Sequence, residues 1–261
     1  MSQSSLLSAL IDTALAAGNA INQIYHGTFE VTLKADASPV TAADHAAEEL
    51  ILAALAAQAP GTPVVAEEQM AAGHAPVVGE EFFLVDPLDG TKEFVQRRGE
   101  FTVNIALVRR GAPVLGVVHA PATGVVYAGD VETAQAWRLT AGGRREQIRV
   151  RAVPQAGFTA VASRSHRTPA TDRYLAGYRI AELVSVGSSL KFCLVAAGEA
   201  DLYPRLGPTM EWDTAAGHAV LVAAGGTVLA ADGLPLTYGK PRFKNPSFVA
   251  AGACVPRPPV A

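Results

Sequence analysis

The sequence predicts an α/β fold of the α+β kind, with layered sheets and helices, and three observations lead to this prediction. Residues 4–60 show the apolar spacing that is typical of helices. From residue 63 onward, short apolar runs bounded by Gly, Pro, Asp or charged residues indicate strands. After residue 157, strand and helix patterns alternate. Because 49% of the 261 residues are hydrophobic, such layers can bury a sizeable core.

Two helices are expected at the start of the chain. Residues 4–25 carry apolar side chains at helical spacing. A second helix is expected from Thr41 to Pro60-Gly61, because Thr41 and Asp44 form a capping pair at its first turn. The strands expected next are the apolar runs at 64–65, 82–85, 102–108, 114–118 and 125–127.

A turn and a boundary are expected in the middle of the chain. Residues 140–147, with Gly142-Gly143, are expected to form the turn. The boundary lies near residues 150–157 and divides the chain into an N-terminal α+β part, 1–155, and a C-terminal α/β part, 156–261. The C-terminal part is expected to contain strands at 159–162, 182–186 and 200–203 and helices at 168–175, 188–197 and 212–224.

Composition narrows the class of protein. A formal net charge of −3 argues against general affinity for polymeric nucleic acid, although a few positioned cations or metal ions still allow a small anionic ligand. Cys193 and Cys254 form no CxxC pair and are expected to be unpaired thiols in a reducing compartment. The longest apolar candidate, residues 215–231, is interrupted by His218 and Gly225-Gly226 and is expected to be a buried helix followed by a strand. No transmembrane segment is therefore expected, and the predicted location is cytoplasmic, at most peripheral on the cytoplasmic face of the inner membrane.

Acidic residues stand where predicted strands or helices begin or end. Asp44 lies at a helix start, Glu67-Glu68 and the pair Asp86 and Asp89 follow strands, and Asp213 opens the last helix. Taken singly, each is explained as a helix cap or a solvated loop charge. Taken together, they offer the oxygen ligands that hard divalent cations such as Mg²⁺ prefer.

The segment Asp86 to Thr91, DPLDGT, is the most informative of these patches. Its two carboxylates lie three residues apart around a proline turn, and the Leu88 carbonyl adds another oxygen. Gly90 permits close approach of the backbone to an anion, and the N–H groups at Gly90 and Thr91 suit a phosphate. The alternative is a plain Asp-Gly turn. The D-x-x-D spacing favours direct attack by water over the covalent aspartyl-phosphate that D-x-D phosphatases form.

These residues resemble a known family. Residues 66–68 (AEE), 86–91 (DPLDGT) and 212–217 (WDTAAG) are similar to the three signatures of the inositol monophosphatase superfamily. This resemblance implies a layered αβαβα sandwich and a lithium-sensitive, Mg²⁺-dependent phosphatase. A narrower resemblance, to the 3′(2′),5′-bisphosphate nucleotidases of that superfamily, is carried by residues 38–44, 86–94, 99–107, 163–166, 187–194 and 201–205.

The resemblance also implies residue roles. The implied metal ligands, for two or more Mg²⁺ ions, are Glu67, Asp86, the Leu88 carbonyl, Asp89 and Asp213, most of them in the N-terminal part. Asp44 and Thr91 are implied to orient the attacking water. The implied substrate contacts are Glu67, Leu88, Asp89, Gly90, Thr91, Ser188, Lys191, Arg205 and Asp213. Lys191 and Arg205 suit a second phosphate, the alternative being surface charges. His166 is either a nucleotide contact or a loop histidine without a role.

The implied substrate is a small bisphosphorylated nucleotide. The expected reaction converts adenosine 3′,5′-bisphosphate to AMP and phosphate, with its sulfated precursor as a second substrate. The alternative is an inositol monophosphatase or a broad sugar-phosphate phosphatase. A non-catalytic sensor of Mg²⁺ or a phosphometabolite is the alternative from another class, and the complete set of carboxylates argues against it. A monomer and a homodimer are both compatible with the sequence.

Overall fold

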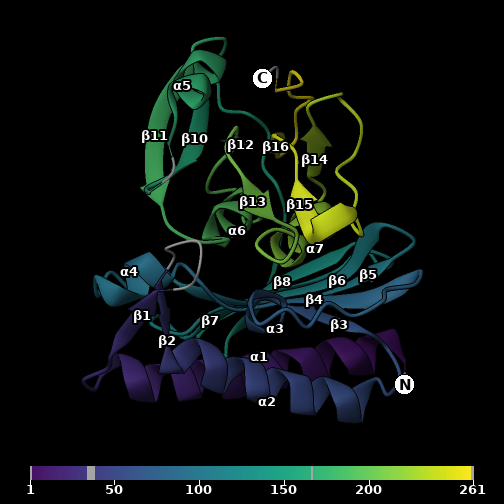
Figure 1. Ribbon diagram of the computed structural model, residues 1–261. Coiled ribbons are helices and arrows are strands. Elements are labelled where there is room, and N and C mark those ends of the chain that lie inside the picture. The colour runs from purple at the N-terminus through teal and green to yellow at the C-terminus, as the bar shows by residue number, and fades with distance from the viewer. Residues whose placement is uncertain (1, 34–38, 166, 260–261) are drawn as a thin grey trace.

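The computed structural model describes residues 2–33, 39–165 and 167–259, which form five layers (Figure 1). Helices α1 (Gln3–Tyr25) and α2 (Ala42–Gln58) cover the outer face of a seven-stranded sheet. Helices α6 (Leu190–Ala196) and α7 (Ala215–Ala223) lie between this sheet and a five-stranded sheet, with α5 (Pro169–Leu175) beyond it. This αβαβα order confirms the predicted fold class.

The seven-stranded sheet contains every strand expected before residue 130. Its order is β3 (Val64–Ala66), β4 (Glu81–Asp89), β5 (Thr102–Arg109), β6 (Ala112–Ala120), β7 (Val125–Asp130), β8 (Gln135–Leu139) and β9 (Arg145–Ile148). Only β3 and β4 pair in parallel within this sheet. The expected turn at 140–147 is wrong in its second half, because Arg145–Ile148 pairs with β8 as an edge strand. Its charged, solvent-facing residues hid the strand pattern.

The five-stranded sheet is mixed, and it contains the three strands expected in the C-terminal part. Its order is β11 (Ile180–Val186), β10 (Phe158–Ser163), β12 (Leu202–Arg205), β16 (Phe248–Ala251) and β14 (Thr227–Ala230). Two small ribbons stand outside these sheets: β1 (Val31–Leu33) pairs with β2 (Pro39–Thr41), and β13 (Thr209–Met210) pairs with β15 (Lys244–Asn245). The described fold also has the short helices α3 (Glu67–Ala71) and α4 (Thr91–Val95) and a 3₁₀ turn at Pro241–Phe243.

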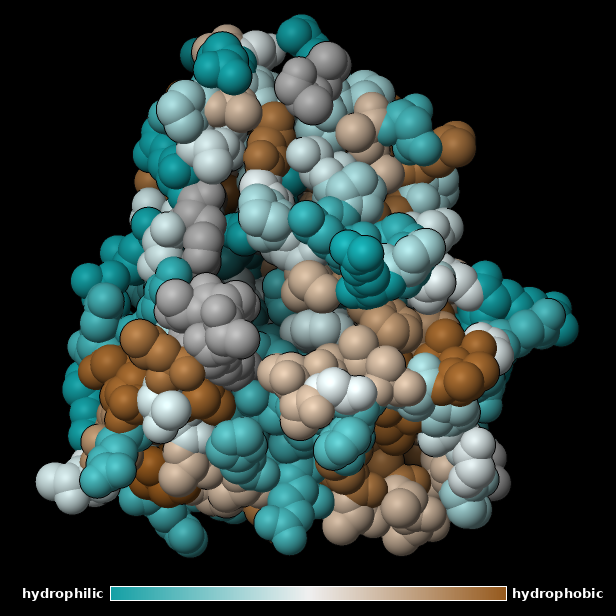
Figure 2. Space-filling model, viewed as in Figure 1, coloured by the Kyte–Doolittle hydropathy of each residue, from teal (hydrophilic) through white to brown (hydrophobic). Residues whose placement is uncertain are grey.

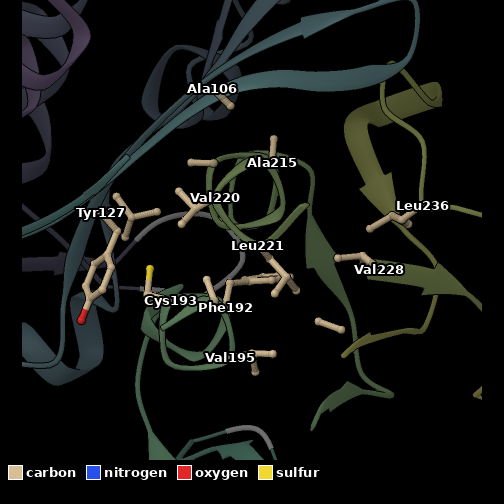
Figure 3. Close-up of a cluster of buried hydrophobic side chains, with 14 of the residues drawn as sticks. Ala106, Tyr127, Phe192, Cys193, Val195, Ala215, Val220, Leu221, Val228 and Leu236 are labelled. Atoms are coloured by element: carbon tan, nitrogen blue, oxygen red, sulfur yellow. The ribbon is translucent and has the colours of Figure 1, made fainter. Parts of the chain in front are cut away.

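The chain leaves the seven-stranded sheet after Ile148 and enters the five-stranded sheet at Phe158, in the region where the sequence predicts a boundary. Helix α7 nevertheless belongs to the C-terminal part and packs on β5, β6 and β7 of the N-terminal sheet. Figure 3 shows Ala215 and Val220 of this helix clustered with Ala106 and Tyr127 of the sheet. The two parts therefore share a core, and their division into separate units stays a prediction.

Helix α1 is the one helix, among the described residues, that is long and apolar enough to cross a membrane by length and composition. One face of α1, including Leu10, Ala14, Ala17 and Ile21, is fully buried. This face packs against α2 and the strands β5, β6 and β7. The amphipathic spacing that predicts the helix is thus explained by burial against the sheet. Residues 215–231, the candidate singled out in the sequence, form α7 and β14, as their pattern predicts.

Two glycines let α7 approach the sheet closely. Gly116 of β6 and Gly129 of β7 are directly paired neighbours. A Cβ atom on Gly116 would lie 2.3 Å from the Ala216 carbonyl oxygen, and one on Gly129 would lie 2.6 Å from the Val220 Cα. The patch that they form seats α7 from Ala216 to Val220, and Asp213 lies just before this helix.

We expect Gly116→Ala to lower the free energy of unfolding by about 1–3 kcal/mol, because the added methyl group overpacks the contact with α7. Urea unfolding followed by circular dichroism measures this loss. Gly142→Ala is the matched control, since a Cβ there meets no atom within 4 Å. Equal stability of the two variants would show that α7 does not need the glycine patch.

Candidate active site

A cavity of about 790 Å³ opens between the two sheets, where a hollow with hydrophilic residues is visible on the surface (Figure 2). All but one of the predicted site residues line it. The lining residues are Glu67, Asp86, Leu88, Asp89, Gly90, Thr91, Ser188, Lys191, Arg205 and Asp213. Asp44 lies behind the wall, and His166 lies outside the described residues. Folding therefore brings ten predicted residues from both halves of the chain into one cavity.

Three carboxylates meet in this cavity. Glu67, Asp86 and Asp213 each place one carboxylate oxygen within 4.8 Å of the other two. Glu67 and Asp86 are brought together by the parallel pairing of β3 with β4, in which Ala66 lies opposite Val85. Asp213 comes from the other half of the chain, and its carboxylate accepts the N–H of Met210 at 2.9 Å. These oxygen donors form a group that is able to hold a hard metal ion.

Asp89 lies beside this group rather than within it. Burial raises the pKa of Asp89 to about 6, although the nearby Lys191 ammonium acts in the opposite direction. Burial also raises the pKa of Asp213 well above its usual range, and the charges of Asp89 and Glu67 add to this shift. Carboxylates crowded in this way repel one another, and a bound cation relieves that repulsion.

The turn between Asp86 and Thr91 is fixed by local geometry. Asp86 accepts the Leu88 N–H at 3.0 Å, and the pairing of β4 with β5 is irregular between Asp86 and Asp89. Gly90 has φ of 93°, and a Cβ there would lie 2.9 Å from the Glu100 carbonyl oxygen. A glycine is therefore required on both counts.

Asp44 reaches the cavity through Thr91. The Thr91 hydroxyl lies 3.2 Å from the Asp44 Oδ1 atom and 3.1 Å from the Leu88 carbonyl, and it can donate to either. The other oxygen of Asp44 accepts the Thr41 N–H and hydroxyl, each at 2.8 Å. This is the predicted capping box at the start of α2. The same carboxylate thus caps a helix and contacts a hydroxyl that faces the cavity.

Two buried cations line another part of the cavity wall. Lys191 donates to the Ser188 carbonyl, and burial lowers the pKa of its ammonium to about 8. Arg205 donates from Nη2 to the Pro208 carbonyl at 2.7 Å, while its buried Nε atom has no hydrogen-bond partner among the described residues. Both side chains are less than a tenth exposed, so the alternative of surface charges is wrong for both. Lys191 and Arg205 give this wall the positive charge that an anionic ligand needs.

A buried polar network holds the Lys191 segment in place. The Ser189 hydroxyl donates to the Asn104 Oδ1 atom at 2.6 Å and lies 2.9 Å from the Thr102 hydroxyl. Thr102 is paired with Asp89 across the sheet. This network ties the start of α6 to β5, directly beside the turn that carries Asp89. Ser188, the preceding residue, has a positive φ of 50°, which is uncommon for serine.

The sequence pattern missed several residues of the cavity wall. Met70, Trp212, Phe243 and Arg242 also line it. Arg242 has φ of 60° and makes no hydrogen bond or ion pair with any other described residue. Trp212 belongs to the signature at 212–217 but was given no role there, and no motif marks Met70, Arg242 or Phe243, because this part of the wall is assembled from segments that are distant in sequence.

Comparison with known proteins identifies relatives across the whole chain. The model of the Inositol monophosphatase family matches residues 2–254. A 3′(2′),5′-bisphosphate nucleotidase CysQ from Escherichia coli K12 is 49% identical over 248 residues, which cover 93% of this chain and 98% of the relative.

Two solved structures extend the comparison. The CysQ structure from Bacteroides thetaiotaomicron is 41% identical with a TM-score of 0.81, covering 96% of this chain and 98% of that one. An inositol monophosphatase from Anabaena is 25% identical with a TM-score of 0.72, covering 96% and 92%. The similarity therefore spans both sheets and every segment that lines the cavity, and the chain belongs to the inositol monophosphatase family.

Proposed function

We propose that this protein is a Mg²⁺-dependent 3′(2′),5′-bisphosphate nucleotidase that hydrolyses adenosine 3′,5′-bisphosphate to AMP and phosphate. The observation that carries the proposal is one cavity that holds a three-carboxylate group together with two buried cations. Its volume of about 790 Å³ suits a ligand of nucleotide size. The similarity to nucleotidases named CysQ supports this substrate class over inositol phosphates.

The donor set fits magnesium. Glu67, Asp86 and Asp213 offer only oxygen atoms as ligands, and Leu88 and Asp89, which supply a carbonyl and a further carboxylate, also line the cavity. We assign these five residues to two or more Mg²⁺ ions. When bound, the metal supplies positive charge to the phosphate oxygens and makes a coordinated water more acidic.

The protein's own groups then handle the proton. We assign Thr91 and Asp44 to orient the attacking water: the water donates a proton toward the Thr91 hydroxyl, which donates its own to Asp44. The water oxygen forms the new bond to phosphorus while the ester bond breaks on the opposite side. The electron pair of that bond goes to the leaving oxygen of the nucleotide, which takes up a proton from solvent.

Different residues bind the two phosphates of the substrate. The backbone N–H groups at Gly90 and Thr91 face the scissile phosphate, next to the carboxylates that hold metal. Lys191 and Arg205 bind the second phosphate, with Ser188 beside them. The Arg205 guanidinium donates from Nη2 to the Pro208 carbonyl and has further N–H groups to offer this phosphate. The sulfated precursor of adenosine 3′,5′-bisphosphate carries the same two anionic positions and is the proposed second substrate.

Phosphate release from a panel of substrates tests the proposal. With Mg²⁺ present, we expect adenosine 3′,5′-bisphosphate to be hydrolysed with a kcat/KM at least about 10² times that for inositol monophosphate. EDTA should abolish release, added Mg²⁺ should restore it, and lithium should inhibit it. A preference for inositol monophosphate would favour the alternative activity, and full turnover in EDTA would contradict the metal-dependent chemistry.

We further propose a cytoplasmic location, which agrees with two free cysteines and with an α1 face that is buried in the fold. The choice between monomer and homodimer stays open as a prediction, and sedimentation equilibrium decides it.

A further inference from the structure

Helix α3 lacks a cap of its own, although it begins with Glu67. The residue before it, Ala66, has no side chain able to accept a hydrogen bond from the first turn. The helix has five residues, so most of its N–H groups lack an intrahelical acceptor. A short uncapped turn would hold the Glu67 carboxylate loosely, yet this carboxylate must meet those of Asp86 and Asp213.

The missing acceptor comes from α2. Glu48 is 5% exposed, and its carboxylate accepts the Glu68 N–H at 2.8 Å. Glu48 lies one helical turn after Asp44, which contacts Thr91. Two successive turns of α2 thus contact two separate segments of the cavity wall, the Thr91 turn and the Glu67 helix.

This arrangement is costly to the fold. Burial, together with the charges of Glu68 and Glu67, raises the pKa of Glu48 to about 7, although the hydrogen bonds from the Glu68 and Gln69 N–H groups act in the opposite direction. A neutral side chain would fill the same space without placing another carboxylate near two acids. A buried carboxylate at Glu48 is therefore explained better by the helix α3 that it holds in place than by a gain in fold stability.

We propose that Glu48 is a positioning residue, which caps α3 from outside and fixes the Glu67 carboxylate where it joins Asp86 and Asp213. The proposal rests on the proposed function, because it assigns Glu67 to metal binding. Glu48 itself does not line the cavity and touches neither metal nor substrate.

The test compares Glu48→Ala and Glu48→Gln with Glu49→Ala, an exposed neighbour on the same helix. Isothermal titration calorimetry with Mg²⁺ alone measures metal affinity, and exchange of the Glu68 amide hydrogen measures the cap. We expect Glu48→Ala to weaken Mg²⁺ binding about 10- to 100-fold and to speed exchange at Glu68. Its KM for the nucleotide at saturating Mg²⁺ should stay within about twofold of the wild type. Glu48→Gln retains an acceptor and should recover most of the affinity, and Glu49→Ala should match the wild type.

Unchanged Mg²⁺ affinity in Glu48→Ala would overturn the proposal, and so would a Glu48→Gln variant as impaired as Glu48→Ala. If Glu48→Ala does not fold, amide exchange and Mg²⁺ titration of Glu48→Gln decide the question. We expect both to be near the wild-type values, and a large loss of Mg²⁺ affinity or of protection at the Glu68 amide would overturn the proposed cap. Glu67→Gln separates the two proposals. If Glu67→Gln loses Mg²⁺ binding and Glu48→Ala does not, the positioning role of Glu48 is wrong and the proposed function stands. A wild-type protein that binds no Mg²⁺ and works without it contradicts the proposed function itself.

Discussion

Asp213→Asn is expected to lower kcat/KM for adenosine 3′,5′-bisphosphate by about 10³-fold, corresponding to about 4 kcal/mol of lost transition-state stabilisation. Asparagine keeps the acceptor for the Met210 N–H, so the start of α7 should not move. What is lost is one of the three carboxylates whose oxygen atoms lie within 4.8 Å of one another. With that charge removed, the remaining carboxylates attract metal less strongly.

The same substitution should raise the stability of the metal-free protein. In EDTA, the three carboxylates repel one another, and neutralising one should raise Tm by about 2–4 °C, or about 1 kcal/mol. Mg²⁺ should raise the Tm of the wild type but no longer that of the variant. Differential scanning calorimetry with and without Mg²⁺ measures both effects.

Asp232→Asn is the matched control for Asp213→Asn. Asp232 is exposed, and like Asp213 it accepts a nearby backbone N–H, here from Leu234 at 3.0 Å. The control should leave both activity and the Mg²⁺-dependent Tm rise unchanged. Near-normal turnover of Asp213→Asn would remove Asp213 from the metal site.

Much of this site could be predicted because its chemistry is concentrated in short segments. Asp86 to Thr91 carries two carboxylates, a carbonyl and a glycine turn within six residues, and the capping pair of Thr41 and Asp44 is equally local. The strands that precede Glu67 and Asp86 are also predictable, since buried strands are continuous apolar runs. Local patterns of this kind survive folding unchanged.

Features that depend on long-range packing could not be predicted in the same way. Nothing in the sequence near Lys191 or Arg205 indicates that both are buried, because burial depends on how distant segments pack. Glu48 looks like an ordinary helix charge, and its partner at Glu68 lies 20 residues further along. The edge strand β9 was read as a turn, because an edge strand needs apolar residues on only one face.

The second large effect concerns the two buried cations that are assigned to the second phosphate. Lys191 also acts on Asp89, so its loss would disturb the carboxylates as well as recognition of that phosphate. Arg205 lines the cavity, and its Nη2 atom donates to the Pro208 carbonyl. The planar guanidinium has further N–H groups, in a geometry that suits two oxygens of one phosphate. Arg205 is therefore the residue best placed to distinguish a bisphosphate from a monophosphate.

We expect Arg205→Met to lower kcat/KM for adenosine 3′,5′-bisphosphate about 30-fold, or about 2 kcal/mol, as for a lost hydrogen bond to a charged group. Hydrolysis of a monophosphate such as inositol monophosphate should change less than about threefold, because it has no second phosphate to lose. Arg144→Met, at a 78% exposed arginine, is the matched control and should affect neither substrate. Steady-state kinetics on both substrates measure the ratio. Equal losses on the two substrates would contradict a role for Arg205 in recognising the second phosphate. They would indicate instead that Arg205 acts at the scissile phosphate or stabilises the fold.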